Sequence, residues 1–199
     1  MITLYWAPHT RASRIIWLLE EAGLPYSLCE VNVHDGSARA HSEFMTASPM
    51  GKVPAIRDGQ ATVFDSAAIC GYIADRYPDS GLAPATDDPQ RALYWQWMVF
   101  TPSVIEPALS EKAGGWTTAT GRNAWGDFDR MIAAFEAGIG ETDWVLGETF
   151  SAADIMLGSS AIFMRMFDMM PESPILNAYA DRCAARPAFQ RAMATEPTG

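Results

Sequence analysis

The sequence predicts an α/β N-terminal domain, with the element order β-α-β-α-β-β-α, followed by an all-α C-terminal domain. Three observations predict this fold class. Strand-like and helical hydrophobic patterns alternate over residues 1–77, residues 78–88 are dense in Pro, Gly and small polar side chains, and helical periodicity dominates over residues 89–199. We therefore expect one domain at 1–77, a linker at 78–88 and a second domain at 89–199.

The first domain begins with a strand-helix-strand unit. Residues 2–6 are strand formers, and the apolar positions after them recur at helical spacing up to Gly23, a natural helix stop. Residues 26–33 alternate and are rich in strand formers, so they predict a second strand. Because the two strands are joined by a helical crossover, we expect them to be parallel.

The rest of the first domain reads as helix, hairpin and helix. A weak helical pattern surrounds Phe44, and a turn at 49–52 precedes a short strand at 53–57. Asp58 and Gly59 form a hairpin turn into a strand at 62–64. A helix then runs from residues 65–66 to Tyr77, where Pro78 ends it.

The second domain is predicted to be helical throughout. Asp88 and Pro89 provide an N-cap and a first-turn proline for an aromatic-rich helix through Phe100. Ser151 and Asp154 form a variant capping box, which indicates a helix start. Further helical stretches are expected near 119–139, 152–170, 174–185 and 187–195.

Composition excludes several classes of protein. With 49% hydrophobic residues and 14 Lys and Arg against 24 Asp and Glu, the chain has core-forming material and a formal charge of −10, which disfavours disorder and nucleic-acid binding. Cys29, Cys70 and Cys183 are far apart and form no C-x-x-C pair, which disfavours a disulfide framework or a zinc site. No apolar stretch reaches the length of a signal peptide or membrane span, so we expect a soluble, cytoplasmic protein. The cysteine pattern leads us to expect no bound metal.

A proline at the entry of a strand is unusual, because proline cannot donate to a sheet ladder. Pro54 stands at this position, and a cis bond after Val53 would explain it.

Five motifs, taken in order along nearly the whole chain, resemble the cytosolic-type glutathione transferase family. They are Leu19-Glu20-Glu21-Ala22-Gly23-Leu24-Pro25-Tyr26, Pro49-x-Gly51-Lys52-Val53-Pro54-Ala55-Ile56, Asp65-Ser66-x-Ala68-Ile69, Phe150-Ser151-Ala152-Ala153-Asp154 and Arg186-Pro187-Ala188-Phe189. The resemblance implies a thioredoxin-like N-terminal domain, glutathione as co-substrate, a helical domain that forms the electrophile pocket, and a homodimer.

The same resemblance assigns a glutathione site. Val53, before a cis Pro54, would offer its backbone N–H and C=O to the central peptide of glutathione. Asp65 would take the ligand's amino group, and Ser66, at a helix N-terminus, would hold the γ-glutamyl carboxylate.

The glycyl carboxylate of glutathione needs a cation. Lys52 is the position that matches the family, and Arg39 and His41 are alternatives, each equally consistent with a bystander role.

A transferase must also hold the glutathione thiol as a thiolate, and the resemblance places one donor after the first strand. Ser-type relatives carry the hydroxyl four residues before an Arg, and Thr10 stands four residues before Arg14, so Thr10 is the first candidate for a Ser/Thr-type active site. Ser13 and His9 remain alternatives, Ser13 as a helix cap and His9 as a turn residue or a second donor. Since no cysteine precedes Cys29, a mixed-disulfide mechanism lacks its nucleophile.

The expected function is conjugation of the glutathione thiolate to a small hydrophobic electrophile, with glutathione-dependent peroxidase or disulfide reductase side activity. Trp6, Thr101 and Trp116 are available for the electrophile pocket. Two alternatives stay open: a non-catalytic glutathione-binding or scaffold protein of the same fold, and a glutathione-dependent isomerase or lyase.

Overall fold

The computed structural model describes residues 1–116, 118–119 and 121–195, which form two compact units. The first unit is Met1–Leu82 together with the chain from Arg186 onward, and the second is Ala83–Ala185. Among the described residues, no helix is both long and apolar enough to span a membrane.

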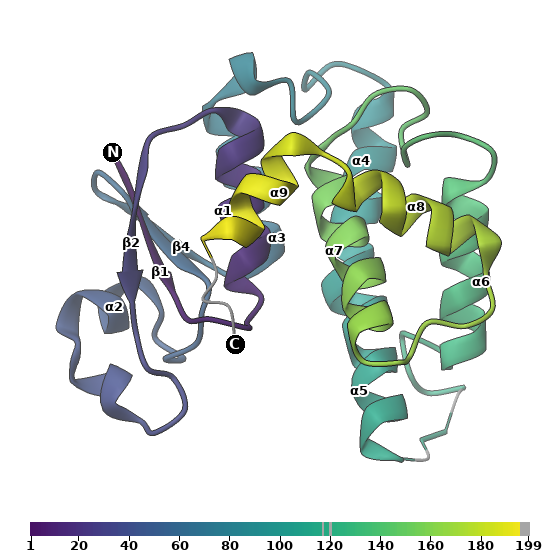
Figure 1. Cartoon of the computed structure of the whole chain (residues 1–199), viewed down its shortest axis with the longest axis horizontal. Helices are drawn as coiled ribbons and strands as arrows, with labels where there is room; N and C mark the ends of the chain where they lie inside the picture. Colours follow the sequence, from purple (N-terminus) through teal and green to yellow (C-terminus); the bar gives the residue numbers. More distant parts are fainter. Residues whose placement is uncertain (117, 120, 196–199) are drawn as a thin grey trace. The chain divides into compact units, whose positions relative to one another are not determined.

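The first unit contains a mixed four-stranded sheet in the order β2-β1-β3-β4 (Figure 1). Its strands are β1 (Ile2–Trp6), β2 (Tyr26–Glu30), β3 (Ala55–Asp58) and β4 (Ala61–Phe64). The β1–β2 pair is parallel, and the β1–β3 and β3–β4 pairs are antiparallel.

Helices cover both faces of this sheet (Figure 1). On one side lie α1 (Ala12–Ala22) and α3 (Ser66–Arg76), and on the other lie the short helix η1 (Ser37–Ala40) and α2 (Ser42–Ala47). The predicted order β-α-β-α-β-β-α and the thioredoxin-like architecture are therefore confirmed.

Two strands are shorter than predicted. The second strand ends at Glu30 rather than at residue 33, although the N–H of Val31 still donates to the Trp6 carbonyl at 2.9 Å. The third strand begins at Ala55 rather than at residue 53, because Pro54 has no N–H to donate to the ladder. The Val53–Pro54 peptide bond is cis.

The β3–β4 hairpin is fixed to the end of α3 by one carboxylate. Asp58 accepts hydrogen bonds from the hydroxyls of Tyr72 (3.1 Å) and Tyr77 (2.6 Å). The hydrogen bond from Tyr77 to Asp58 is the main reason why the pKa of Tyr77 is raised to about 12, and burial raises this pKa further. The short helix η2 (Pro78–Ser80) then leads out of this part of the unit.

The last described helix, α9 (Pro187–Ala194), packs against α1 rather than within the second unit (Figure 1). Two ion pairs join the helices: Arg186 forms a double hydrogen bond with Glu21 at 2.5 and 2.9 Å, and Arg191 bonds Glu20 at 2.7 Å. Residues 186–195 thus group with the first unit, whereas the sequence reading assigned all of 89–199 to one helical domain.

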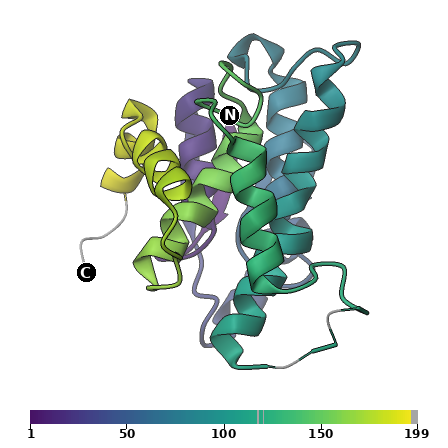
Figure 2. The same ribbon diagram turned by 90° about the vertical axis from the view of Figure 1, so that its right-hand side faces the viewer.

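The second unit is a bundle of helices around α7 (Figure 2). Its helices are α4 (Gln90–Phe100), the wider π-type turn η3 (Thr101–Ile105), α5 (Glu106–Gly114), α6 (Phe128–Ile139), α7 (Ala152–Met166) and α8 (Pro174–Ala184). The helix expected over 119–139 begins only at Phe128, because the Asp127 carboxylate caps it there by accepting from the Arg130 N–H.

The start of α7 is held by a buried carboxylate. Asp154 accepts from the backbone N–H groups of Val145 and Ser151, both at 2.9 Å, and from the hydroxyls of Ser151 (3.0 Å) and Tyr179 (2.9 Å). The predicted capping box is present. Burial raises the pKa of Asp154, and the four donors act against that shift.

Candidate active site

Three loop segments meet at one end of the sheet in the first unit. Ala55, the first residue of β3, pairs with Tyr5 near the end of β1 and with Phe64 at the end of β4. Because both pairs are antiparallel, the residues that follow β1, precede β3 and follow β4 all emerge at this same end. These are the segments that carry most of the predicted site residues.

The segment after β1 is organised by hydroxyl groups. Thr10 Oγ1 donates to the Ala7 carbonyl at 2.6 Å and accepts from the Ala12 N–H at 3.2 Å, so this half-buried hydroxyl closes the turn and caps α1. Ser13 Oγ donates to the Thr10 carbonyl at 2.9 Å from a buried position. His9 is exposed and has a positive φ of 56°, as befits a turn residue.

The segment before β3 is held by a side chain that the sequence analysis missed. Ser48 is fully buried, and its hydroxyl donates to the Lys52 carbonyl at 2.7 Å and accepts from the Lys52 N–H at 3.2 Å. The turn closes through Gly51, whose N–H donates to the Ser48 carbonyl at 2.8 Å and whose φ is 66°. Ser48 thereby fixes the backbone that leads into Val53 and Pro54.

The segment after β4 ends in the N-terminus of α3. Asp65 has a φ of 75°, and its Oδ1 accepts from the N–H groups of Ala67 (2.9 Å) and Ala68 (3.4 Å). Ser66 is the first residue of the helix and is buried. Asp65 already accepts from two of the first N–H groups, so the Ser66 side chain and the positive dipole end of this eleven-residue helix are what make the point suited to an anion.

A buried cation, Arg14, lies in the interior next to the start of α1. Arg14 of α1 is 2% exposed and lies close enough to Cys70 of α3 to lower the pKa of that thiol. Asp65 acts on the same thiol in the opposite sense, and burial dominates, raising the pKa of Cys70 to about 12. Arg14 therefore belongs to the packed interior between α1 and α3.

The three candidate cations differ in their surroundings. Lys52 and Arg39 are exposed, and Lys52 directly precedes Val53. His41 caps α2 instead: its Nδ1 accepts from the Phe44 N–H at 3.1 Å, and its Nε2 lies 3.7 Å from Cys29 Sγ. Of the ten predicted site residues, the sheet end gathers His9, Thr10, Ser13, Lys52, Val53, Pro54, Asp65 and Ser66, while Arg39 and His41 belong to the η1–α2 segment.

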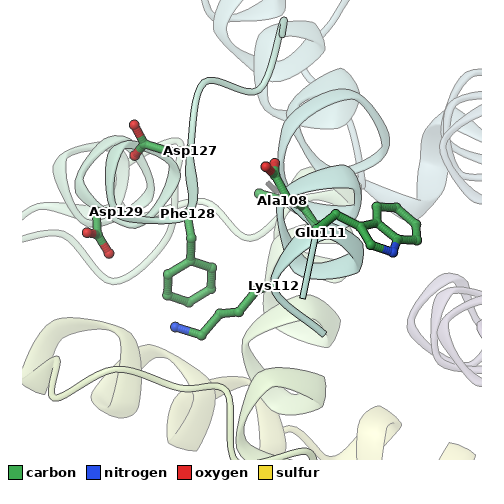
Figure 3. A pocket seen from close by; sticks show the side chains of 7 residues that line it. Ala108, Glu111, Lys112, Asp127, Phe128 and Asp129 are labelled. Carbon is green, nitrogen blue, oxygen red and sulfur yellow. The ribbon is translucent and has the colours of Figure 1, made fainter. Parts of the chain in front are cut away.

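The second unit has a small open cavity of about 270 Å³ between α5 and the start of α6 (Figure 3). It is lined by Ala108, Glu111, Lys112, Trp116, Asp127, Phe128 and Asp129. The Lys112 ammonium lies 3.6 Å from the centre of the Phe128 ring. Glu111 is fully engaged, accepting from the backbone and hydroxyl of Thr118 and from the indole of Trp125. An aromatic wall and an ammonium are thus available there.

Comparison with known proteins identifies both parts of the chain. Residues 1–75 match the profile of the glutathione S-transferase N-terminal domain, and residues 106–191 match that of its C-terminal domain. A glutathione S-transferase of Hyoscyamus muticus is 27% identical over 197 residues, covering 90% of this chain and 91% of the relative. Glutathione S-transferase 3 of Zea mays is 26% identical, covering 92% and 89%.

Solved structures agree over the full length. A glutathione transferase from Methylococcus capsulatus is 26% identical with a TM-score of 0.81, covering 98% of both chains. A sphingomonad glutathione S-transferase, solved in complex with glutathione, is 29% identical with a TM-score of 0.78, covering 96% of this chain and 97% of the other.

Proposed function

Because the chain belongs to the glutathione S-transferase family, we propose that it is an enzyme that binds glutathione, activates its thiol and joins the glutathione, through its sulfur, to a small hydrophobic electrophile. The observation that carries this proposal is the meeting of three segments at one end of the sheet. Together they offer what glutathione needs: an extended backbone edge, a helix N-terminus and a hydroxyl donor.

Each part of glutathione has a proposed partner. The backbone of Val53 pairs with the central peptide, and Ser66 at the start of α3 holds the γ-glutamyl carboxylate. Asp65 takes the ligand's amino group; the residue is exposed, and Oδ1 is the oxygen that caps the helix. Lys52 pairs with the glycyl carboxylate, with Arg39 as an alternative, and His41 contributes through the η1–α2 segment.

We assign thiol activation to Thr10. Lowering a thiol pKa by about 2 units requires about 2.7 kcal/mol, within the range that one hydrogen bond to a charged group supplies together with a helix N-terminal field. The Thr10 hydroxyl donates to the Ala7 carbonyl in this structure, so on binding it would exchange that acceptor for the glutathione sulfur. Ser13 is directed to the Thr10 carbonyl and supports the turn, and His9 is a second, exposed donor.

The first experiment is the ultraviolet absorbance of the bound glutathione thiolate as a function of pH. We expect a lowered thiol pKa in the wild type, retention of that shift in Thr10→Ser, and its loss in Thr10→Ala with glutathione still bound. Ser13→Ala is the matched hydroxyl deletion and should keep the shift. An unshifted thiol on the wild-type protein would instead indicate a non-catalytic glutathione-binding protein.

We place the electrophile on the helical unit, in the cavity of Figure 3. Trp116 and Phe128 supply aromatic surface on which a flat, hydrophobic aromatic electrophile can stack. Trp116→Ala should raise the KM for such an electrophile and leave the KM for glutathione unchanged. If both KM values stay at the wild-type level, the electrophile binds elsewhere.

We further propose a cytoplasmic homodimer. Three free cysteines are typical of a reducing compartment, where glutathione is kept in its reduced form. For self-association, α4 presents Trp95 and Val99, one helical turn apart and 39% and 50% exposed.

A further inference from the structure

Cys29 differs from the other two cysteines in its surroundings. It lies on the edge strand β2 and is half-buried, whereas Cys70 and Cys183 are fully buried. Its parallel partner in the adjacent strand is Tyr5, so both side chains leave the sheet on the same face, the one covered by α2. Neither residue is among those to which the proposed transfer reaction assigns a role.

His41 directs an N–H at the sulfur of Cys29. The Nδ1 atom of His41 accepts from the Phe44 N–H at 3.1 Å, so in the neutral ring the proton resides on Nε2. This Nε2 lies 3.7 Å from Cys29 Sγ. The helix cap of α2 therefore fixes the tautomer that donates to the cysteine.

A second donor on the same face lacks an acceptor. The Tyr5 side chain is 0% exposed, and among the described residues its hydroxyl has no hydrogen-bond partner. The Tyr5 ring meets the His41 ring edge-on, with centroids 5.8 Å apart. Burial raises the pKa of Tyr5 and the neighbouring Cys29 adds to the shift, so the hydroxyl keeps its proton and stays a donor.

We propose that Cys29 is a site of reversible oxidation by hydroperoxides, whose sulfenic acid is held by His41 and Tyr5. The Cys29 sulfur attacks one peroxide oxygen, an S–O bond forms and the O–O bond breaks. The sulfur loses two electrons to the peroxide, and the departing oxygen leaves as an alcohol, or as water from hydrogen peroxide, after taking up the thiol proton. The new oxygen on sulfur would offer an acceptor to the Tyr5 hydroxyl, which lies on the same face of the sheet and lacks a partner among the described residues.

The geometry explains why this thiol alone should react. The N–H of His41 can donate to the attacking sulfur, and Cys29 is half-buried rather than fully buried, so a small peroxide can reach it. Cys70 and Cys183 are inaccessible, and burial raises the pKa of the Cys70 thiol to about 12. They therefore serve as internal controls in the same molecule.

The test treats the reduced full chain with hydrogen peroxide in the presence of dimedone, which traps sulfenic acids, and locates the adduct by peptide mass spectrometry. We expect one adduct, on the peptide that contains Cys29, and none in Cys29→Ser. Equal or faster labelling of Cys70 or Cys183, or no adduct at all, would overturn the proposal. The readout needs neither glutathione nor an electrophile, so it is independent of the proposed transferase activity.

Two variants distinguish the effect of the hydrogen-bond donors on Cys29 from the effect of side-chain packing. His41→Asn keeps an oxygen to cap α2 but removes the ring N–H, and Tyr5→Phe removes only the hydroxyl. In each we expect the rate of labelling at Cys29 to fall about tenfold, the effect of losing one hydrogen bond to a charged group. Wild-type rates in both folded variants would contradict the assigned roles, and if one variant fails to fold, the other still decides.

Discussion

Three side-chain hydroxyl groups stabilise two different turns at the sheet end of the first unit. Thr10 and Ser13 organise the turn after β1, while Ser48 ties both backbone atoms of Lys52 into the turn before β3. Of these, Ser48 is the most deeply buried. Its loss would leave the N–H and C=O of Lys52, whose hydrogen bonds to it are partly buried, without this partner, which costs more than losing an exposed hydrogen bond.

Ser48→Ala should therefore destabilise the protein by about 1–3 kcal/mol, measured by denaturant unfolding. Because the freed turn leads into Val53, the KM for glutathione should rise while kcat changes little. Ser103→Ala is the control, since the Ser103 hydroxyl bonds only the Val99 carbonyl on an exposed helix surface and its removal should cost less than about 0.5 kcal/mol. Equal losses in the two variants would argue against a positioning role for Ser48.

At the scale of elements, ion pairs and an aromatic contact join α9 to α1. The Arg186–Glu21 pair is the more buried of the two ion pairs, and Glu21 also accepts from the indole of Trp17 at 2.9 Å. The Trp17 ring in turn meets Phe189 edge-on at 5.0 Å. Removing the arginine would leave a buried carboxylate with only one of its partners in this contact.

We expect Arg186→Gln to lower the free energy of unfolding by about 2 kcal/mol, a value reduced for the partial exposure of the arginine. Arg130→Gln breaks an exposed pair with Asp127 at 3.3 Å and should cost less than about 0.5 kcal/mol. Urea unfolding of the two variants measures the difference. A loss at Arg186 no larger than that at Arg130 would show that the Arg186–Glu21 pair does not hold α9 in place.

The contact between α3 and the β3–β4 hairpin should weaken at high pH. The pKa of Tyr77 is raised to about 12 in the folded protein, chiefly by its hydrogen bond to Asp58, and an unfolded tyrosine titrates near 10. The stabilisation is thus complete below about pH 10 and is lost as the pH rises through 12. The stability difference between wild type and Tyr77→Phe should shrink over this interval, and a difference independent of pH would contradict the assignment.

Local sequence signals predicted most elements, and the failures have local causes. Strand and helix patterns, caps and turn residues identified every β-strand and α-helix of the β-α-β-α-β-β-α order but not the short helices η1 and η2, and the capping box located the start of α7. Helix α5 was missed because its nine residues bury only Ala108, which leaves almost no apolar stripe. The docking of α9 was missed because charged residues 165 positions apart, such as Glu21 and Arg186, carry no periodic signal.

For the whole molecule, the exposed apolar side chains predict where copies would associate. Light scattering should give a molar mass of twice 21.8 kDa for the wild type. Val99→Asp places a charge on the exposed face of α4 and should yield the monomer mass, because a desolvated carboxylate opposes association. Ile175→Asp on α8, which is 40% exposed, should leave the mass unchanged.

The candidate site was predictable as a set of segments rather than as a set of contacts. Strand pairing brings the segments that carry Thr10, Val53 and Ser66 to one sheet end, and the roles of these residues toward glutathione stay predictions. The role of Ser48 and the capping of α2 by His41 could not be read from the sequence, since both depend on where a side chain points once the turn has formed.

The return of α9 to the first unit also sets the order in which the chain can mature during synthesis. Ala83–Ala185 is bracketed by two segments of one unit, so the second unit is the first whose residues have all left the ribosome. Until residues 186–195 follow, α1 lacks the contacts that Phe189 makes with Trp17 and that Arg186 makes with Glu21. A stop codon just before Arg186 would thus leave the second unit complete and the first unit without α9.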